Sequence, residues 1–512
     1  MITEKNTIFD FMRAYRPDKS GVAFIRGAKK FSYPRFFKET DRVAAGLAAL
    51  GINKGDVVMI ALPTIEQGIV AFYAVSRIGA VASMIHPLME RGEFLQAVEE
   101  QKPKAVFLSD VNFAKLGKGL KGVRKIVCPF GAYGYIGLPR GRKFSAFSGD
   151  GSEPAVYMRS GGTSGVPKTV VLSAAAVNAL TKNLLEILSE NNFGQKDRML
   201  VVMPMFHGFG LLVGLHSSIC TDMPPVIMPV FKAERVVKAI ARHRITTVIA
   251  VPRMINKLLN TKGFEGKNVS CLENVYVGGD AVDAELEKRF DKRMKEAGSS
   301  CVMSPGYGLT ETGSVCVLSP RKIGGAAVGK PLLNMKCRIV LDDGSEAAPG
   351  EVGELLLAGN QMMTGYLGDD KATQDAFTEI DGEKWLKTGD YFKASEDGVL
   401  YFAGRKKRLI KISGMNVFPS EIERVTTEEG FAEVCAAIEV KVQEKPFIAL
   451  FIEGKLSDAQ IKALKERIVD KLSRWHEPRF VICLNELPRT NIGKMDYVRL
   501  SNEFESCCKE SS

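Results

Sequence analysis

Small, hydroxylated and basic residues gather in the segment from Ser160 to Lys168, which reads SGGTSGVPK. Glycines let backbone N–H groups approach phosphate oxygens, hydroxyls donate further hydrogen bonds, and a lysine neutralises charge. The order GxxxxGK[ST] of a Walker A loop is absent, and the residues after Lys168 have the pattern of a strand. The segment predicts a phosphate-binding loop between two strands, with a surface loop that binds nothing as the alternative.

A second group of polar residues occurs at Tyr307–Thr312, which reads YGLTET. The flat ring of Tyr307 suits a nucleobase, the hydroxyl of Thr310 suits a phosphate oxygen, and the carboxylate of Glu311 suits a hard cation such as Mg²⁺. By themselves these residues also fit a core aromatic and a solvated surface acid.

Four shorter motifs contain glycines, carboxylates and cations that also suit the binding of a nucleotide. They are Gly278–Ala281 (GGDA), Thr388–Asp390 (TGD), Gly404–Arg408 (GRKKR) and Pro488–Lys494 (PRTNIGK). Taken singly, each also fits an ordinary turn or a solvated charged face.

In this order, the motifs resemble those of the acyl-adenylate-forming (AMP-dependent) ligases, and most of all the acyl-CoA synthetases. The resemblance covers roughly residues 20–500. Three differences from the family, in or next to the patterns [ST]SGTTGxPKG and GGAPL, stand out. Arg159 stands where the family has Thr, Ser or Tyr, Thr169 replaces Gly, and Asp280 replaces Ala.

The resemblance implies a role for each motif around ATP. The phosphate loop would contact the nucleotide through Ser160, Gly161, Gly162, Thr163, Ser164, Gly165 and Lys168. Gly279, Asp280 and Ala281 would line the adenine pocket with Tyr307 and Gly308, and Thr310 would contact the α-phosphate. Glu311 would hold Mg²⁺, and Asp390 would accept hydrogen bonds from both ribose hydroxyls. Arg405 would reach the ribose or the phosphates, and Lys411 would contact the nucleotide. Lys494 would bridge the acid and the α-phosphate as a catalytic residue.

Other residues are assigned by the resemblance to the second half of a two-step reaction. Lys407 corresponds to a hinge about which a small C-terminal domain rotates. Ser413 and Gly414 would line the path of the incoming thiol, although the family often has Lys where Ser413 stands.

The segment Pro204–Gly210 (PMFHGFG) resembles the PLFHxxG segment of fatty and aryl acid ligases. Phe206, His207 and Gly208 would form the acyl pocket, with His207 beside the carboxylate as a catalytic residue; a core histidine is the alternative. No acidic residue occurs from Leu200 to Cys220 to pair with a substrate ammonium. Since burying an unpaired ammonium is costly, a hydrophobic acid is favoured over an α-amino acid.

The implied reaction joins a carboxylic acid to ATP with Mg²⁺, giving an acyl-adenylate and diphosphate, and then passes the acyl group to coenzyme A. One alternative acceptor is the phosphopantetheine of a carrier protein. A nucleotide-binding protein without turnover is a second, more remote alternative, which the presence of Glu311, Asp390, Arg405 and Lys494 disfavours.

The composition agrees with a folded enzyme of several structural units. The 512 residues are 45% hydrophobic and 25% charged, and 70 basic against 59 acidic residues give a net charge of +11. The charge comes without a nucleic-acid-binding motif, so no nucleic acid partner is expected. The ten cysteines include no CxxC pair, no signal peptide is visible, and the apolar stretch Met199–Cys220 is interrupted by Pro, His and Gly. A cytoplasmic protein without a membrane span is therefore expected.

The elements that position these motifs alternate between short apolar strands and periodic helices. Strands are expected at Val57–Leu62, Ala105–Leu108, Ala155–Met158, Thr169–Leu172, Met199–Met203, Thr247–Val251, Asn274–Val277 and Phe480–Leu484. Helices are expected at Arg42–Leu50, Ile65–Ile78, Arg91–Gln101, Ala174–Leu188, Ala233–His243 and Asp283–Ala297, and after a cap at Ser457.

This alternation predicts an α/β fold with parallel sheets covered by helices. The Gly- and Asp-rich turns of Gly329–Phe402 predict a small antiparallel, β-barrel-like subdomain. We expect an adenylation domain at 1–403 and a small mobile α+β lid domain at 404–512.

Overall fold

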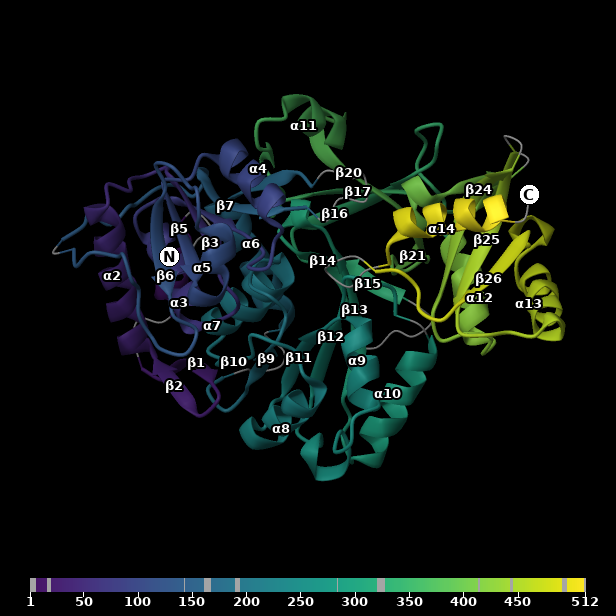
Figure 1. Ribbon diagram of the computed structural model, residues 1–512, viewed down its shortest axis with the longest axis horizontal. Coiled ribbons are helices and arrows are strands. Elements are labelled where there is room, and N and C mark those ends of the chain that lie inside the picture. The colour runs from purple at the N-terminus through teal and green to yellow at the C-terminus, as the bar shows by residue number, and fades with distance from the viewer. Residues whose placement is uncertain are drawn as a thin grey trace.

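The computed structural model describes residues 6–15, 20–141, 143–160, 167–188, 194–282, 284–319, 327–412, 415–442, 445–489 and 495–510. It is a mixed α/β structure with a large N-terminal part and a smaller C-terminal part, which lie side by side (Figure 1). The α/β fold class predicted from the sequence is confirmed.

One parallel sheet forms the middle of the N-terminal part. Its strands follow the order β13-β12-β11-β9-β10-β1, all parallel, with β2 antiparallel at the edge. They are β1 (Val22–Arg26), β2 (Lys29–Ser32), β9 (Met199–Val201), β10 (Pro225–Ile227), β11 (Thr247–Ala250), β12 (Asn274–Val277) and β13 (Val302–Gly308). Its helices include α8 (Ala233–His243), α9 (Pro252–Leu259) and α10 (Ala284–Glu296), with a 3₁₀ turn η3 (Gly266–Asn268).

A second sheet carries the predicted phosphate loop. Its strands β6-β5-β3-β4-β7 are parallel, and β8 and β18 continue it in antiparallel pairing. They are β3 (Val57–Ala61), β4 (Val81–Met84), β5 (Ala105–Ser109), β6 (Arg124–Cys128), β7 (Pro154–Arg159), β8 (Thr169–Ser173) and β18 (Gly365–Tyr366). The associated helices are α1 (Ile8–Ala14), α2 (Tyr33–Ala49), α3 (Glu66–Arg77), α4 (Arg91–Gln101), α5 (Asp110–Leu116) and α6 (Ala174–Leu188).

Helix α2 begins nine residues before the predicted start at Arg42, at Tyr33. Ser32 caps its N-terminus, and Pro34 occupies the first turn, where its missing N–H has no partner to lose. The extra turns bury Phe36 in the main core. Burial of aromatic side chains therefore extends the helix beyond the segment that the apolar periodicity indicated.

The most apolar stretch of the chain forms a π-helix, η2 (Phe209–Ser217), which continues into α7 (Ser218–Cys220). All residues from Gly210 to Cys220 are buried. Among the described residues, no helix is long and apolar enough to cross a membrane.

Antiparallel strands extend the first sheet beyond β13, so the antiparallel pairing expected for Gly329–Phe402 is present, but these strands continue the large sheet instead of forming a separate β-barrel-like subdomain. The order is β13-β14-β15-β21-β20-β17-β16, with β19 on β20. They are β14 (Val315–Leu318), β15 (Ala327–Pro331), β16 (Met335–Val340), β17 (Gly353–Gly359), β19 (Phe377–Ile380), β20 (Glu383–Ala394) and β21 (Leu400–Arg405), with helix α11 (Asp370–Ala376). Strand β13 is parallel to β12 and antiparallel to β14, so it links the two halves of this sheet.

The C-terminal part has sheets and core clusters of its own. It contains β22 (Ile410–Ile412), β23 (Met415–Val417), α12 (Pro419–Glu428), β24 (Cys435–Val442), β25 (Lys445–Glu453), α13 (Asp458–Lys471), η6 (Arg474–His476), β26 (Phe480–Leu484) and α14 (Tyr497–Glu510). Ser457 caps α13 through a capping box with Gln460, as its sequence predicts. The domain boundary at 403/404 stays a prediction and falls inside β21.

Candidate active site

The end of β13 places Tyr307 next to a tight turn, η4 (Thr310–Thr312). Thr312 fixes this turn, because its hydroxyl accepts from Leu309 N at 3.2 Å and donates to Ser314 O at 2.7 Å. A side chain at Gly308 would collide with the carbonyl oxygen of Ser314. Glycine is therefore required where the chain turns back, and the turn leaves Glu311 half-buried.

Tyr307, Asp390 and Arg405 meet although they come from three strands. The Tyr307 hydroxyl donates to Asp390 Oδ2 at 2.6 Å, and Arg405 Nε lies 3.1 Å from Asp390 Oδ1. Asp390 and Arg405 are direct partners in the register of β20 and β21. The structure thus brings together the residues predicted to bind adenine and ribose.

Asp390 is fully buried, and this burial raises the pKa of its carboxyl, while Arg405 and the Tyr307 hydroxyl act in the opposite direction. Within the described part of the chain, Asp390 Oδ1 accepts no hydrogen bond despite its contact with Arg405. A buried carboxylate oxygen with spare accepting capacity suits the hydroxyl of a ligand.

Glu311 and Lys168 are linked by Tyr366, a residue that no sequence motif indicated. The Tyr366 hydroxyl donates to Glu311 Oε1 at 2.8 Å, and Lys168 Nζ lies 4.7 Å from the centre of the Tyr366 ring. Tyr366 belongs to the two-residue strand β18, which pairs with β8 directly after the phosphate loop. Such a short strand leaves no periodic signal in a sequence.

The two ends of the phosphate loop are described and are joined to each other. Ser160 N donates to Lys168 O at 2.8 Å, and Lys168 N donates to Ser160 Oγ at 3.1 Å. The predicted phosphate contacts Gly161, Gly162, Thr163, Ser164 and Gly165 lie outside the described residues.

The GGDA segment follows β12 and runs beside the end of β13. A Cβ at Gly278 would lie 3.2 Å from the carbonyl oxygen of Gly306, the residue that precedes Tyr307. Gly279 has φ +83°, a conformation that glycine adopts without strain. Asp280 is exposed, and its carboxylate accepts from the N–H of Ala281 at 3.0 Å.

The predicted acyl segment lies against the same turn. A side chain at Gly208 would collide with the carbonyl oxygen of Gly313, so the backbones touch there. The half-buried ring of Phe206 lies between His207, with centroids 4.6 Å apart, and His86, at 4.4 Å. Burial lowers the pKa of His86, a residue that no sequence motif indicated.

Comparison with known proteins agrees with this arrangement. A family model described as AMP-binding enzyme matches residues 11–367. The chain belongs to this family. Asp390, Arg405 and Lys494 lie beyond the matched segment.

Curated relatives match nearly the whole chain. A 4-coumarate–CoA ligase of Oryza sativa subsp. japonica is 28% identical over 474 residues, covering 89% of this chain and 86% of the relative. A long-chain-fatty-acid–CoA ligase of Bacillus subtilis (strain 168) is 26% identical, covering 95% and 92%. ATP-bound MatB from Rhodopseudomonas palustris has a TM-score of 0.88 at 21% identity, covering 97% and 98%, which shows a shared fold.

The predicted hinge of this family member lies in an exposed turn. Lys407 is in η5 (Lys406–Arg408), and Lys411 is exposed on β22. Arg408 differs: its guanidinium is 2.5 Å from Glu423 Oε1 and 3.9 Å from the centre of the Tyr497 ring. The sequence places Lys407 and Arg408 in one charged run and gives no sign that Arg408 packs inward. Ser413, Gly414 and Lys494 lie outside the described residues.

Magnesium fits Glu311 only as a partner of ATP. In the described residues, no group of three or more His, Cys, Asp or Glu side chains is arranged to hold a metal ion. Mg²⁺ commonly binds through one or two carboxylates together with substrate phosphates and water. A lone half-buried carboxylate next to a phosphate loop matches that pattern.

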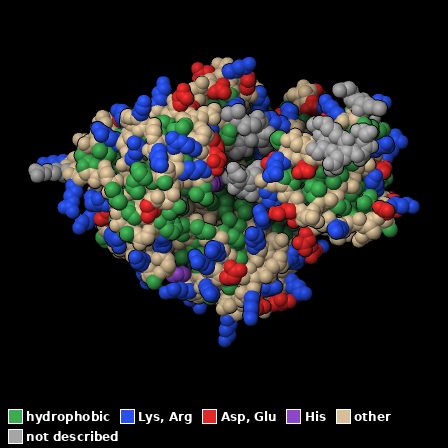
Figure 2. Space-filling view, viewed as in Figure 1, with side chains coloured by type: hydrophobic (Ala, Val, Ile, Leu, Met, Phe, Trp, Pro, Cys, Tyr) green, Lys and Arg blue, Asp and Glu red, His purple; other side chains and the backbone are tan. Residues whose placement is uncertain are grey.

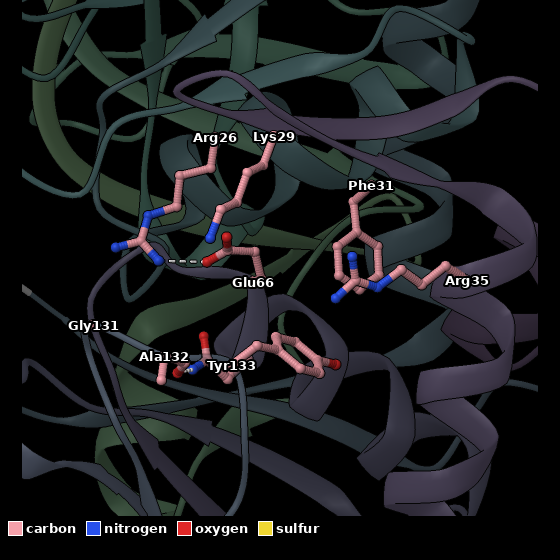
Figure 3. Close-up of a pocket in the computed structure, with 9 residues that line it drawn as sticks. Arg26, Lys29, Phe31, Arg35, Glu66, Gly131, Ala132 and Tyr133 are labelled. Carbon is pink, nitrogen blue, oxygen red and sulfur yellow. Dashed lines mark hydrogen bonds and ion pairs between the residues drawn. The ribbon is translucent and has the colours of Figure 1, made fainter.

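Figure 2 shows apolar side chains in a recess between the N-terminal and C-terminal parts, with Lys and Arg spread over the surrounding face. A separate cavity of about 190 Å³ lies near β1 and β2, where Arg26 pairs with Glu66 at 2.6 Å (Figure 3). None of the predicted site residues lines that cavity.

Proposed function

We propose that this protein activates a carboxylic acid with ATP and then transfers the acyl group to coenzyme A. The observation that carries the proposal is the meeting of Tyr307, Asp390 and Arg405 beside the turn that holds Glu311. Membership of the AMP-binding enzyme family supports it, as do relatives named as CoA ligases.

The first step joins two anions, so the site must reduce repulsion and align the acid with the α-phosphorus. Asp390 would accept ribose hydroxyls, while Thr310, Lys168 and the phosphate loop would bind phosphate oxygens. Lys494 would bridge the acid and the α-phosphate. Bound Mg²⁺, held at Glu311, would neutralise phosphate charge. The carboxylate oxygen forms a bond to the α-phosphorus, and diphosphate leaves.

In the second step, the sulfur of coenzyme A takes the place of AMP on the acyl carbon. The thiol of coenzyme A loses its proton and attacks the carbonyl carbon of the acyl-adenylate, and AMP departs with the shared oxygen. Rotation of the 404–512 lid about Lys407 would exchange the Lys494 loop for Ser413 and Gly414 between the two steps. The exposed position of Lys407 supports this assignment.

The acid is proposed to be hydrophobic. Phe206, His207 and Gly208 lie against the Glu311 turn through the contact of Gly208 with Gly313, so this segment is close to the reacting groups. The absence of acidic residues from Leu200 to Cys220 disfavours an ammonium-bearing acid. The ring of His86, packed on Phe206, would form part of the same wall.

The test is to incubate the purified protein with ATP, Mg²⁺ and a panel of fatty, aryl and amino acids, with and without coenzyme A. Diphosphate and AMP are both followed. Acid-dependent diphosphate with AMP turnover that requires coenzyme A is the expected result. Diphosphate without stimulation by coenzyme A would identify a carrier protein as the acceptor, and no signal with any acid would contradict the proposal.

Lys494→Ala tests the assignment of the catalytic lysine in the same assay. We expect a loss of diphosphate formation on the order of 10²-fold or more, because a charge that acts in the transition state is removed. Lys462→Ala is the control, since its side chain on α13 is 81% exposed. Equal activities of the two variants would overturn the role of Lys494.

A further inference from the structure

Two residues at which the sequence departs from the family, Arg159 and Thr169, face each other at the base of the phosphate loop. Arg159 ends β7 and Thr169 begins β8, and they are direct partners in the antiparallel register of these strands. Both side chains reach the last turn of α4, where they contact the consecutive residues Glu100 and Gln101.

The charge of Arg159 is already paired inside the protein. Its side chain is only 9% exposed, Nη1 donates to Glu100 Oε2 at 3.1 Å, and Nε lies 3.9 Å from Glu93 Oε1. Nη2 donates to the carbonyl oxygen of Pro167 at 3.2 Å, at the far end of the loop. The guanidinium therefore ties both ends of the loop to α4.

Thr169 makes the second tie. It is 1% exposed, and its hydroxyl accepts from Gln101 Nε2 at 3.1 Å. Gln101 is itself held, because its Oε1 accepts from Ser83 Oγ at 2.5 Å on strand β4. Glycine at position 169 would leave the buried amide of Gln101 without this acceptor, which is unfavourable.

These ties fix the backbone from which Lys168 emerges. Lys168 lies between Pro167, which accepts a hydrogen bond from Arg159, and Thr169, which accepts one from Gln101. Its own backbone makes two hydrogen bonds with Ser160. Its ammonium group rests over the ring of Tyr366, which is bonded to Glu311. The position of helix α4 is thus connected to the predicted phosphate and Mg²⁺ ligands.

We propose that Arg159 and Thr169 are positioning residues that clamp the base of the phosphate loop to α4 and orient Lys168 toward the phosphates of ATP. The proposal rests on the proposed function, which places ATP at this loop. Arg159 itself is assigned no phosphate contact, because its guanidinium donates to Glu100 and to the Pro167 carbonyl and lies near Glu93.

The first test measures KM for ATP and kcat for Arg159→Thr, Glu100→Gln and the double variant. Each single variant should raise KM for ATP roughly five- to tenfold with a smaller change in kcat, and the double variant should be no worse than the worse single one. Glu99→Gln, an exposed neighbour on the same helix, is the charge-matched control and should behave like the wild type.

A direct contact between Arg159 and phosphate predicts the opposite for Glu100→Gln. Removing the carboxylate would then free the guanidinium and tighten ATP binding. Such a result, or additive effects in the double variant, would overturn the clamp. Thr169→Ser should keep the wild-type KM, whereas Thr169→Val should raise it, since only serine restores the acceptor for Gln101.

A second measurement does not depend on catalysis. Hydrogen–deuterium exchange of the ligand-free protein is followed in peptides spanning Pro167–Leu172. Arg159→Thr should exchange faster there than wild type and Glu99→Gln, at unchanged melting temperature. Unchanged exchange would overturn the clamp, whereas a wild type without acid-dependent diphosphate release would overturn the proposed function alone.

Discussion

The hydroxyl of Tyr307 donates a 2.6 Å hydrogen bond to Asp390, a residue 83 positions further along the chain. Tyr307 ends a strand of the parallel sheet, whereas Asp390 lies on β20 of the antiparallel extension. The residue predicted to lie against adenine and the residue predicted to hold the ribose are therefore one bonded unit. A substitution at either residue should therefore alter the position or the hydrogen bonding of the other.

Replacing Tyr307 with Phe should weaken both stability and ATP binding. Asp390 is buried, so losing a donor should lower the free energy of unfolding by about 1–3 kcal/mol. KM for ATP should rise several-fold, because the Asp390 carboxylate, which accepts hydrogen bonds from the ribose hydroxyls, is less firmly positioned. Denaturant unfolding and steady-state kinetics measure the two effects.

Tyr276→Phe on the neighbouring strand β12 is the matched control for this substitution. In the described structure, the buried Tyr276 hydroxyl has no hydrogen-bond partner, so its removal should not destabilise the protein. If both variants had the same free energy of unfolding and the same KM for ATP, the hydrogen bond between Tyr307 and Asp390 would contribute to neither.

The pKa of Asp390 predicts opposite effects of pH on stability and on binding. Burial raises this pKa above 3.8, so the folded chain holds the proton more tightly than the unfolded chain. The contribution to stability is full below pH 3.8 and is lost as pH rises through the raised pKa. ATP binding needs the carboxylate, so KM for ATP should rise as pH falls into the same range.

Asp390→Asn separates these two effects. At neutral pH it should be at least as stable as the wild type, because the cost of a buried charge is gone, yet it should bind ATP far more weakly. Its KM for ATP should lose the acid-side increase. Melting temperatures and KM values for ATP measured across pH 4–8 check this. A strongly destabilised variant would contradict the conclusion that the buried charge of Asp390 lowers the stability of the fold.

Glu311→Gln should impair the Mg²⁺-dependent step. An amide binds a hard cation less well than a carboxylate, so we expect a loss in diphosphate formation on the order of 10²-fold and a higher Mg²⁺ requirement. Tyr366→Phe releases Glu311 from its hydrogen bond and should have a much smaller effect. A titration with Mg²⁺ at saturating acid distinguishes them; an unchanged Mg²⁺ requirement in Glu311→Gln would refute the ligand assignment.

The sequence predicted the strands that are buried on both faces. Asn274–Val277 is strand β12 to the residue, and Val57–Leu62 is one residue longer than β3, because short apolar runs between turns leave few alternatives. Helix α2 was predicted too short, since its first turns depend on a cap and on buried aromatic residues. These are local signals that apolar periodicity does not register.

The motifs predicted which residues belong to the candidate site but not how they are joined. The contact of Tyr307 with Asp390 depends on β13 pairing with strands on both sides, which is a property of the whole sheet. Tyr366 and His86 were missed because they contribute through tertiary contacts rather than through a motif. The roles of Lys407, Lys411 and Lys494 stay predictions.

His216 is a buried titratable residue to which no motif assigns a role. It is fully buried in the π-helix η2, and its Nδ1 lies 2.8 Å from the hydroxyl of Tyr73. Burial lowers the pKa of His216 from 6.5 to about 3. Between these values, the unfolded chain binds a proton that the folded chain does not, so stability should fall as pH falls, by at most about 1.4 kcal/mol per pH unit.

The double variant His216→Phe, Tyr73→Phe tests this, because it removes the titrating ring without leaving the Tyr73 hydroxyl unpaired. Its free energy of unfolding is measured from pH 7 to 4. The slope of this energy with pH should correspond to the uptake of about one proton fewer on unfolding than in the wild type. His243→Gln, at the half-buried end of α8, is the control and should flatten the profile less. If the double variant kept the wild-type slope, other groups would be responsible for the acid sensitivity.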